Sequence, residues 1–483
     1  MIYCLGYWKI NKHGDHFMKF STLLSAASLI SLCISTITVA QDKHFTISQI
    51  KTASELRDNA MEGTMAWDIL ESITTEVGPR FPGSEGDKLA VKWAMKKFEQ
   101  LGYDKIWKEP VPVPVWERGI GTGEIVSPFP QPVHLAALGF SISTPKGGIE
   151  AEVIHFKTIQ DLSNAPEGSL EGKIAFISHR MKRAKDLSEY RKAGGARRIG
   201  AVEASKKDAI GIIIRSLGTD DHRNPHTGGQ RYQDGIKKIP AAALSNPDAD
   251  VLVRQFERGL PVTFKMNLQN KDLGQSVTYN VIGEIKGSSR PDEVVVIGGH
   301  LDSWDLGTGA IDDGAGIAIS MEAGRIIGNM KNRPARTIRV IAFAAEEIGL
   351  YGGREYARAH KGELNNHIIG AESDLGSGRV WEFSPGVNES SLPVMHEIHN
   401  VLKPLGIKWG DNKGTGGPDI GPMHRAGVPA LNLQQDATNY FDLHHTPDDT
   451  LDKVDAKDLN QNVAAYVTFS YLAADYDGRF DGK

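Results

Sequence analysis

Two short, almost continuously apolar runs most constrain what this chain can fold into. Residues 294–297 and 338–343 are rich in β-branched side chains and too short for helices. Runs of this kind are typical of central parallel strands that are covered on both faces. Each run is followed by charged residues, and sites in open α/β sheets gather at the carboxyl ends of strands. We therefore expect both the core and the functional site around residues 294–347.

Similar runs recur through the carboxyl-terminal half and alternate with helical patterns. Further strands are expected at residues 280–285, 367–370 and 429–433, and helices at residues 315–329, 352–360, 392–402 and 456–475. This alternation predicts an α/β fold with a mostly parallel sheet and helices on both faces.

Length and composition narrow the class of protein. A chain of 483 residues exceeds one ordinary domain, so two or three domains are expected. With 40% hydrophobic and 24% charged residues, it has the composition of a soluble globular protein. The net charge is −5, and acidic and basic residues are mixed along the chain, so the sequence predicts no basic patch that would bind nucleic acid or an anionic membrane. We expect neither nucleic acid nor a membrane as a partner.

Residues 1–40 are predicted to be a signal peptide, with Met18 as an alternative start. Lys19 precedes an apolar run at residues 20–39 that ends in small side chains. An uncleaved anchor is the alternative, because the run approaches the length of a membrane span. Its Ser and Thr content favours cleavage. We therefore expect an exported protein, periplasmic or secreted, with no stable membrane anchor.

Helical patterns at residues 53–73 and 86–101 are separated by a Gly/Pro loop at residues 78–84. In residues 109–119, proline recurs at alternate positions, which excludes a helix or a central strand. This segment is predicted to be an edge segment or a connection. We place a boundary just after Gly119.

A second unit follows this boundary. Its strands are predicted at residues 150–156, 173–178, 210–215 and 262–268, with a long polar span at residues 180–208. Residues 237–259 should form a strand, a turn and a helix capped by Asn246 or Asp248. Loop 219–229 has two histidines and two aspartates but no strand to hold them. It is predicted to be solvated, with a substrate contact as the alternative.

Metal-binding side chains follow the strands of the carboxyl-terminal half. They are His300, Asp312, Glu346, Glu347 and Asp374, and a pair, His444 and His445, precedes the last helix. Both cysteines, Cys4 and Cys33, lie in the predicted signal peptide, so thiolate ligands are excluded. Imidazoles combined with several carboxylates suit zinc or another divalent metal.

The number of donors fits two metals better than one. Asp312 is predicted to bridge them, with His300 and Asp374 on one metal and Glu347 and His445 on the other. Two divalent ions are balanced by three ligand carboxylates and one hydroxide only if Glu346 stays outside the ligand set. Glu346 is then free to act as the general base.

A Gly-rich stretch at residues 307–316 invites a dinucleotide-binding interpretation. Its glycines give G-x-G-x-x-D, so the third glycine is absent. An acidic side chain also stands where a pyrophosphate would approach. We therefore reject a dinucleotide site.

The strand-end residues lie in four motifs: GGHLDSWDLGTGAIDDGAG, AFAAEEIGLYGGREYA, AESDLGSG and HHTPDDTLDKVD. Together they resemble the zinc-dependent exopeptidase family of aminopeptidases and glutamate carboxypeptidases with paired zinc ions. The resemblance covers nearly the whole chain after residue 40. It implies a peptidase domain with a smaller, β-rich protease-associated domain inserted. The expected boundaries are peptidase residues 41–119 and 276–483 around an insert of residues 120–275.

The resemblance also assigns a role to each matching position. It makes His300, Asp312, Glu347, Asp374 and His445 the ligands of two zinc ions, with Asp312 bridging. Glu346 matches the general base, and Asp302 matches the carboxylate that orients His300.

Substrate contacts follow less directly from the motifs. Several relatives have a tyrosine before the last ligand, and this chain has His444, so His444 or Tyr440 is expected to stabilise the oxyanion. A free substrate carboxylate would be held by an arginine, with Arg379 or Arg425 as candidates. Aminopeptidase, carboxypeptidase and dipeptidase preferences stay open, as does a homodimer.

The expected function is that of an exported metallopeptidase that hydrolyses dipeptides or short peptides through an activated water molecule. A hydrolase of other amides, such as acylated amino acids, is the alternative. A non-catalytic, receptor-like homologue is disfavoured because all five ligands and the base are present.

Overall fold

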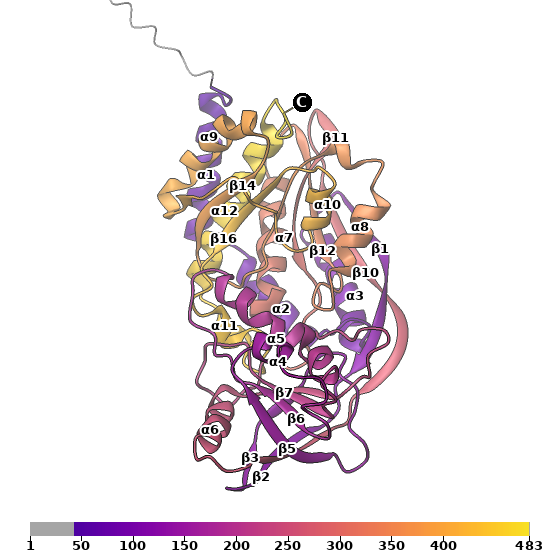
Figure 1. The fold of residues 1–483 in the computed structure, drawn as a ribbon. Coiled ribbons are helices and arrows are strands. Elements are labelled where there is room, and N and C mark those ends of the chain that lie inside the picture. Colours follow the sequence, from indigo (N-terminus) through magenta and orange to yellow (C-terminus); the bar gives the residue numbers. More distant parts are fainter. Residues whose placement is uncertain (1–42, 483) are drawn as a thin grey trace, which may run out of the picture. The chain divides into compact units, whose positions relative to one another are not determined.

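A computed structural model describes residues 43–482, which form two eight-stranded β-sheets (Figure 1). The predicted signal peptide, with Met18, Lys19 and both cysteines, lies outside the described residues. Among the helices of residues 43–482, none is long and apolar enough to cross a membrane.

The first sheet contains the predicted central strands. In spatial order its strands are β1 (Lys105–Glu117), β10 (Lys271–Ile285), β12 (Arg336–Phe343), β11 (Arg290–His300), β13 (His367–Glu372), β16 (Ala430–Gln435), β14 (Val380–Gly386) and β15 (Lys408–Trp409). The neighbours β12, β11, β13 and β16 are parallel. Antiparallel pairs flank them on both sides. The predicted α/β fold with a parallel centre is confirmed.

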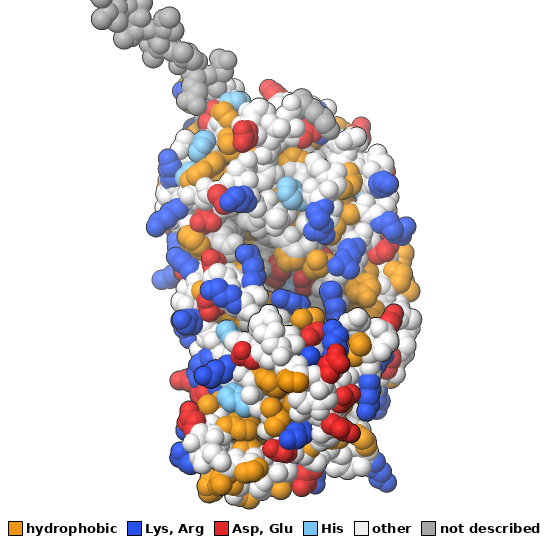
Figure 2. Space-filling model, viewed as in Figure 1, with side chains coloured by type: hydrophobic (Ala, Val, Ile, Leu, Met, Phe, Trp, Pro, Cys, Tyr) orange, Lys and Arg blue, Asp and Glu red, His pale blue; other side chains and the backbone are white. Residues whose placement is uncertain are grey.

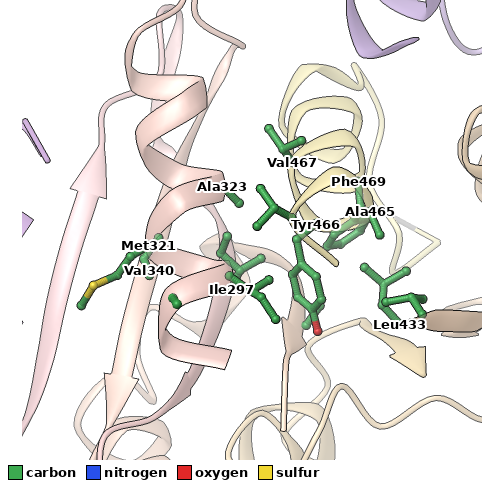
Figure 3. Packing of buried hydrophobic residues seen from close by; sticks show 14 of the residues in the cluster. Ile297, Met321, Ala323, Val340, Leu433, Ala465, Tyr466, Val467 and Phe469 are labelled. Carbon is green, nitrogen blue, oxygen red and sulfur yellow. The ribbon is translucent and has the colours of Figure 1, made fainter. Parts of the chain in front are cut away.

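Helices cover both faces of this sheet, as predicted. One face carries α1 (Ile47–Glu62), α2 (Ala66–Glu76), α3 (Glu85–Gln100), α7 (Ala315–Gly328), α9 (Leu392–Leu402) and α12 (Ala456–Asp475); the other carries α8 (Tyr351–Ala359) and α10 (Gly421–Arg425). Along β11, Val295 and Ile297 pack with the first group, while Val294 and Val296 pack with the second. Figure 3 shows Ile297 close to α7 and α12. Burial on both faces explains why this run is apolar without alternation.

The helical pattern of residues 53–73 extends over two helices, α1 and α2, so the prediction of one continuous helix is wrong. The break comes at Gly63, which ends α1. Thr64 Oγ1 then donates a hydrogen bond to Asn460 Oδ1 at 2.6 Å, and Met65 N donates to Glu322 Oε1 at 3.0 Å. Glycine is a poor helix residue, and these bonds attach the break to α12 and α7 instead.

The proline-rich segment forms β1, which lies at the edge of the first sheet, as predicted. Proline has no N–H, so Pro110, Pro112 and Pro114 cannot donate to a neighbouring strand. The ladder toward β10 therefore takes the N–H groups of the residues between them. Alternate prolines fit a strand only where one of its edges is unpaired.

Residues between β1 and β10 form the second sheet. In spatial order its strands are β3 (Gln131–Val133), β2 (Gly121–Ser127), β9 (Thr263–Leu268), β5 (Ile149–Phe156), β6 (Ile174–Ile177), β7 (Gly211–Arg215), β8 (Ala241–Leu244) and β4 (Leu135–Ala137). A short helix, α4 (Ile159–Ser163), connects β5 to β6. The chain thus leaves the first sheet after β1 and returns at β10. The domain boundaries at residues 120 and 275 stay predictions, because one compact unit contains both sheets.

Two local features of this sheet differ from the sequence expectations. The polar span contains α5 (Ser188–Ser205), whose buried side is built from small residues such as Ala193 and Ala201. Small residues give no strong helical periodicity, so the pattern did not predict this helix. The next helix, α6 (Asn246–Phe256), is capped by Ser245, whose Oγ accepts a hydrogen bond from Asp248 N at 3.2 Å. The predicted caps, Asn246 and Asp248, lie inside the helix.

Candidate metal centre

The five predicted ligands meet at one edge of the first sheet. His300 ends β11, Glu347 follows β12 and Asp374 follows β13. Because these strands are parallel, their carboxyl ends lie side by side. Asp312 lies in the turn Ala310–Gly314 before α7, and His445 follows the short helix α11 (Tyr440–Leu443). The donor atoms fall into two groups that share Asp312.

The first group surrounds His300. Its Nε2 lies 3.1 Å from Asp312 Oδ1 and 3.4 Å from Asp374 Oδ1. On the other side of the ring, Nδ1–H donates to the backbone carbonyl of Asp302 at 2.9 Å. A proton held on Nδ1 by this bond would leave Nε2 free for a metal. Nε2 is therefore the nitrogen available to a metal.

The second group surrounds His445. Its Nε2 lies 3.2 Å from Asp312 Oδ2 and 3.0 Å from Glu347 Oε2. Its Nδ1 lies 3.2 Å from the carbonyl of Thr227 and 3.3 Å from Arg197 Nη1. A proton on Nδ1 donated to Thr227 would leave Nε2 free for a metal. Thr227 belongs to loop 219–229 of the second sheet. His444 joins this group, with its Nε2 3.7 Å from Asp312 Oδ2.

The buried carboxylates support occupancy by divalent cations. Within the part of the chain that the structure describes, Asp312 Oδ2 and Glu347 Oε1 are buried and accept no hydrogen bond. Buried carboxylate oxygens without a compensating donor or cation are unfavourable. Imidazole nitrogens and carboxylate oxygens are also the donors that zinc prefers in sites without thiolates. The donor set therefore fits metal ions.

Asp302 and Glu346 lie directly behind the ligands. The Asp302 carboxylate accepts hydrogen bonds from the backbone N–H groups of Glu346 and Glu347, at 3.1 and 3.2 Å. Its nearer oxygen is 3.6 Å from His300 Nδ1, so the shorter contact to that ring is the backbone carbonyl. Burial, followed by the charge of Asp374, raises the pKa of Glu346 well above its usual range. Nearby divalent cations would oppose this rise.

Comparisons with known proteins agree with this geometry. The profile of the family described as Peptidase family M28 matches residues 280–470. Carboxypeptidase Q from Homo sapiens is 34% identical over 412 residues, which cover 85% of this chain and 86% of that protein. The chain belongs to peptidase family M28. The predicted likeness to plasma glutamate carboxypeptidase, or carboxypeptidase Q, is confirmed, and so is the prediction of a zinc peptidase.

Solved structures show the same fold. A peptidase M28 precursor from Shewanella amazonensis SB2B gives a TM-score of 0.89 at 48% identity, covering 90% of this chain and 98% of that one. BSAP, a zinc aminopeptidase from Bacillus subtilis, gives a TM-score of 0.62 at 21% identity, covering 85% and 97%. The M28 fold therefore extends over both sheets.

The structure brings two of the four predicted substrate residues, His444 and Tyr440, to the metal centre of this M28 peptidase. His444 stacks on His445, with ring centroids 3.5 Å apart, and Tyr440 lies 5.0 Å from His444. Arg379 does not join them. It is 44% exposed, lies 3.4 Å from the Asp458 carboxylate and is not among the residues that line the cleft.

Loop 219–229 is solvated only in part: residues 221–224 are exposed or half-buried, whereas residues 225–228 are buried, so the prediction is wrong for that second part. Asp220, His226 and Thr227 are at most 4% exposed. The loop packs against the segment that carries the two histidines, and Thr227 N donates to the carbonyl of His445 at 3.1 Å. Residues on a Gly/Pro loop became buried because a distant part of the chain covers them.

Two further residues support the site, although the sequence assigned no role to either: Arg80 carried no signal, and Asp449 was only part of the HHTPDDTLDKVD motif. Arg80, from loop 78–84, is fully buried and donates to the carbonyls of Leu301, Thr308 and Gly309 at 2.5, 2.6 and 2.8 Å. Asp449 accepts from the N–H groups of Ile311 and Asp312 at 2.6 and 3.2 Å. Burial raises the pKa of Asp449 to about 7. Both residues shape the backbone on which the ligands sit.

A cleft of about 1110 Å³ opens over the metal centre of the M28 peptidase. Figure 2 shows a hollow with acidic side chains in its depth and basic side chains around it. Both sheets supply its lining, which includes Glu346 from the first sheet and Arg197, Arg198 and Arg231 from the second. The lining also includes Arg425, one of the two predicted carboxylate ligands.

Proposed function

We propose that this M28 peptidase is an exported exopeptidase that holds two zinc ions and hydrolyses dipeptides or short peptides. The observation that carries the proposal is Asp312, whose two carboxylate oxygens face different imidazoles, those of His300 and His445. A carboxylate placed in this way suits a bridge between two cations. Export rests on the signal peptide predicted over residues 1–40.

Glu346 is the proposed general base. When bound, the zinc ions would polarise the scissile carbonyl and lower the pKa of a water molecule. Among the described residues, none forms a hydrogen bond or ion pair with the Glu346 carboxylate, which lines the cleft. Glu346 takes a proton from water as its oxygen attacks the carbonyl carbon. It delivers that proton to the leaving nitrogen as the C–N bond breaks.

Asp302 and His444 assist this reaction in the proposal. Asp302 fixes the backbone of Glu346 and so directs the carboxylate that moves the proton. Burial and the neighbouring His445 lower the pKa of His444 well below its usual range, so that its ring is neutral. A neutral imidazole can still donate one hydrogen bond to a developing oxyanion.

We place the substrate carboxylate at the arginines of the cleft. In the described part of the chain, Arg197 Nε is buried without a hydrogen-bond partner. Burial, followed by the charge of Arg197, lowers the pKa of Arg198, so the two cations lie close together without full compensation. A carboxylate would relieve this repulsion and could bind a guanidinium through two hydrogen bonds. The name of the human relative, carboxypeptidase Q, supports this orientation.

The first test is Glu346→Gln. The variant should keep both zinc ions and lose about 10²- to 10⁴-fold in kcat on a dipeptide, because the amide cannot accept the proton. Elemental analysis and initial rates measure the two quantities. Glu389→Gln, at an exposed position, is the control and should match wild type. Full activity in Glu346→Gln, or wild-type protein without zinc, would contradict the proposal.

The second test compares the two ends of the substrate. Wild-type enzyme is given one dipeptide in free, N-acylated and C-amidated forms, each with and without a chelator. We expect the C-amidated form to lose at least about tenfold in kcat/KM, since the arginines lose their partner. Preferred cleavage of the N-acylated form would point to acylated amino acids instead. Equal rates on the carboxylate and the amide would refute the arginine assignment.

A further inference from the structure

The second sheet reaches the metal centre through loop 219–229, whose residues 225–228 are buried. We propose that His226, held by Asp220, is a positioning residue that sets the affinity of the His445 side for its metal. This inference rests on the proposed function, because it assumes that metal ions bind at the two groups that share Asp312.

His226 bonds the backbone next to the ligand. Its Nδ1–H donates to the carbonyl of His444 at 2.7 Å, and its Nε2 lies 2.5 Å from Asp220 Oδ1. Each nitrogen of the ring thus faces an oxygen atom. The side chains of His226 and Asp220 are 0% and 1% exposed. A ring fixed at both ends in this way cannot rotate away from the His444 carbonyl.

Asp220 is anchored to a regular element of the second sheet. Asn246, the first residue of α6, donates from Nδ2 to Asp220 Oδ1 at 3.1 Å and to the carbonyl of Gly218 at 3.2 Å. The backbone N–H of His226 also donates to Ser216 Oγ at 2.8 Å. A continuous set of hydrogen bonds therefore runs from α6 through Asp220 and His226 to the His444 carbonyl.

Gly218 provides the space for this arrangement. A Cβ on Gly218 would lie 2.1 Å from His226 Nε2 and 2.4 Å from Asp220 Oδ1. Such distances are well inside van der Waals contact. The glycine is thus required by the close approach of the two side chains.

The loop residue after His226 completes the hold on the ligand. Thr227 N donates to the His445 carbonyl at 3.1 Å, and its own carbonyl accepts from His445 Nδ1 at 3.2 Å. His445 has a φ of +61°, a conformation that non-glycine residues adopt only when their surroundings impose it. Residues 226 and 227 supply those surroundings. Loss of the His226 bond should let this backbone relax and move Nε2 away from its metal.

The orientation of His300 does not depend on loop 219–229. His300 Nδ1 is bonded by the carbonyl of Asp302, two residues further along the same loop. His300 N donates to Asp313 Oδ2 at 3.0 Å, again within the same segment. A change at His226 should therefore weaken one metal site and spare the other. A merely structural role would lower the stability of the metal-free protein and weaken both sites alike.

The test measures zinc binding to purified full-length protein by competition with a chelator, together with the Tm of the metal-free form. Wild type should bind two zinc ions tightly. His226→Ala should keep one tight site and lose about 10- to 100-fold at the other, with a nearly unchanged metal-free Tm. His226→Asn, whose amide can donate near the position of Nδ1, should recover most of that affinity. His155→Ala is the matched control, because His155 lies on β5 of the second sheet and bonds Ser178 Oγ rather than Asp220 or His226.

The outcomes separate the inference from the function on which it rests. Wild-type protein that binds fewer than two zinc ions would contradict both the proposed function and the inference on His226. Two wild-type affinities in His226→Ala, or equal losses at both sites, would overturn the inference alone. If His226→Ala does not fold, Asp220→Asn replaces it, since it keeps the side-chain size and removes the charge that holds the ring. Unchanged zinc affinity in Asp220→Asn would then also overturn the inference.

Discussion

The two halves of the candidate metal centre use the same kinds of donor but are built in different ways. His300 ends a central strand, and its ring is oriented by a carbonyl two residues away. His445 follows a four-residue helix, and its ring is oriented by Thr227, which is 218 residues away in the chain. One half is thus produced by the first sheet alone. The other half forms only when the second sheet has folded against the first.

The first sheet alone therefore cannot form the whole metal centre. The carboxyl ends of parallel strands place His300, Glu347 and Asp374 together whatever the insert does. The position of His445 depends on contacts that the first sheet does not contain. The predictions below test how independent the two halves are.

The largest effect is expected for Asp312→Ala, which removes the residue shared by both halves. The variant should bind no zinc and retain only the activity of chelator-treated wild type, because each metal loses a carboxylate ligand. Elemental analysis and dipeptide hydrolysis check this. A variant that still holds one zinc ion would show that the halves are independent.

Arg80→Met should affect the His300 half through the stability of the fold. It removes a donor from three carbonyls, those of Leu301, Thr308 and Gly309, of which Gly309 keeps the hydrogen bond from Gly314 N. We expect the free energy of unfolding to fall by about 3 kcal/mol, measured by urea denaturation. Arg358→Met, which removes an exposed side chain, should stay within about 0.5 kcal/mol of wild type. A loss below about 1 kcal/mol for Arg80→Met would contradict this role.

Asp302→Asn should have an intermediate effect, because Asp302 touches both halves. Its carbonyl still bonds His300, but the amide keeps only one acceptor for the N–H groups of Glu346 and Glu347. We expect kcat to fall about 10- to 100-fold while zinc remains bound. Zinc content and initial rates are the measurements. Loss of zinc with kcat per bound zinc unchanged would mean that Asp302 serves the ligands rather than the base.

The smallest effect concerns the pH dependence of the metal-free protein. Burial raises the pKa of Asp419 to about 8 and that of Asp449 to about 7, against about 3.9 in the unfolded chain. Between these values the folded state binds more protons, so the free energy of unfolding falls as the pH rises toward 8. The lowered pKa values of His444 and His445 act oppositely, but only below about 6.5, where the unfolded imidazoles are charged.

We therefore expect the Tm of the metal-free protein to fall by about 2 °C or more from pH 6.5 to pH 8.5. Asp419→Asn should reduce this fall, because its neutral amide resembles the protonated carboxyl. Since both acids belong to the first sheet, His226→Ala should leave the fall unchanged. A Tm that rises over this pH range would contradict the assignment.

Much of the His300 half, together with Glu347 of the His445 half, could be predicted from the sequence. Short apolar runs identify central strands, and residues that follow parallel strands must meet at one edge, so His300, Glu347 and Asp374 were accessible to local rules. The same rules predicted an edge segment or a connection at β1, because alternate prolines exclude a helix or a central strand.

The His445 half could not be predicted by local rules of this kind. The polar composition of loop 219–229 is the same whether water or another segment covers it, so nothing local distinguishes a solvated His226 from a buried one. Arg80 lies in a Gly/Pro loop and gave no signal for the same reason. The helix α5 was hidden because alanine and glycine form its buried side. In each case the deciding partner lies far away in the sequence.

The three prolines of β1 have a further consequence, for how this protein behaves at high concentration. Along residues 110–114, the outward edge of the strand offers carbonyl acceptors but lacks donors. A strand from a second molecule could form only half of its ladder there, so the edge resists the sheet-to-sheet growth that leads to aggregates. Replacing these prolines by threonine would restore the donors and turn the edge into a template.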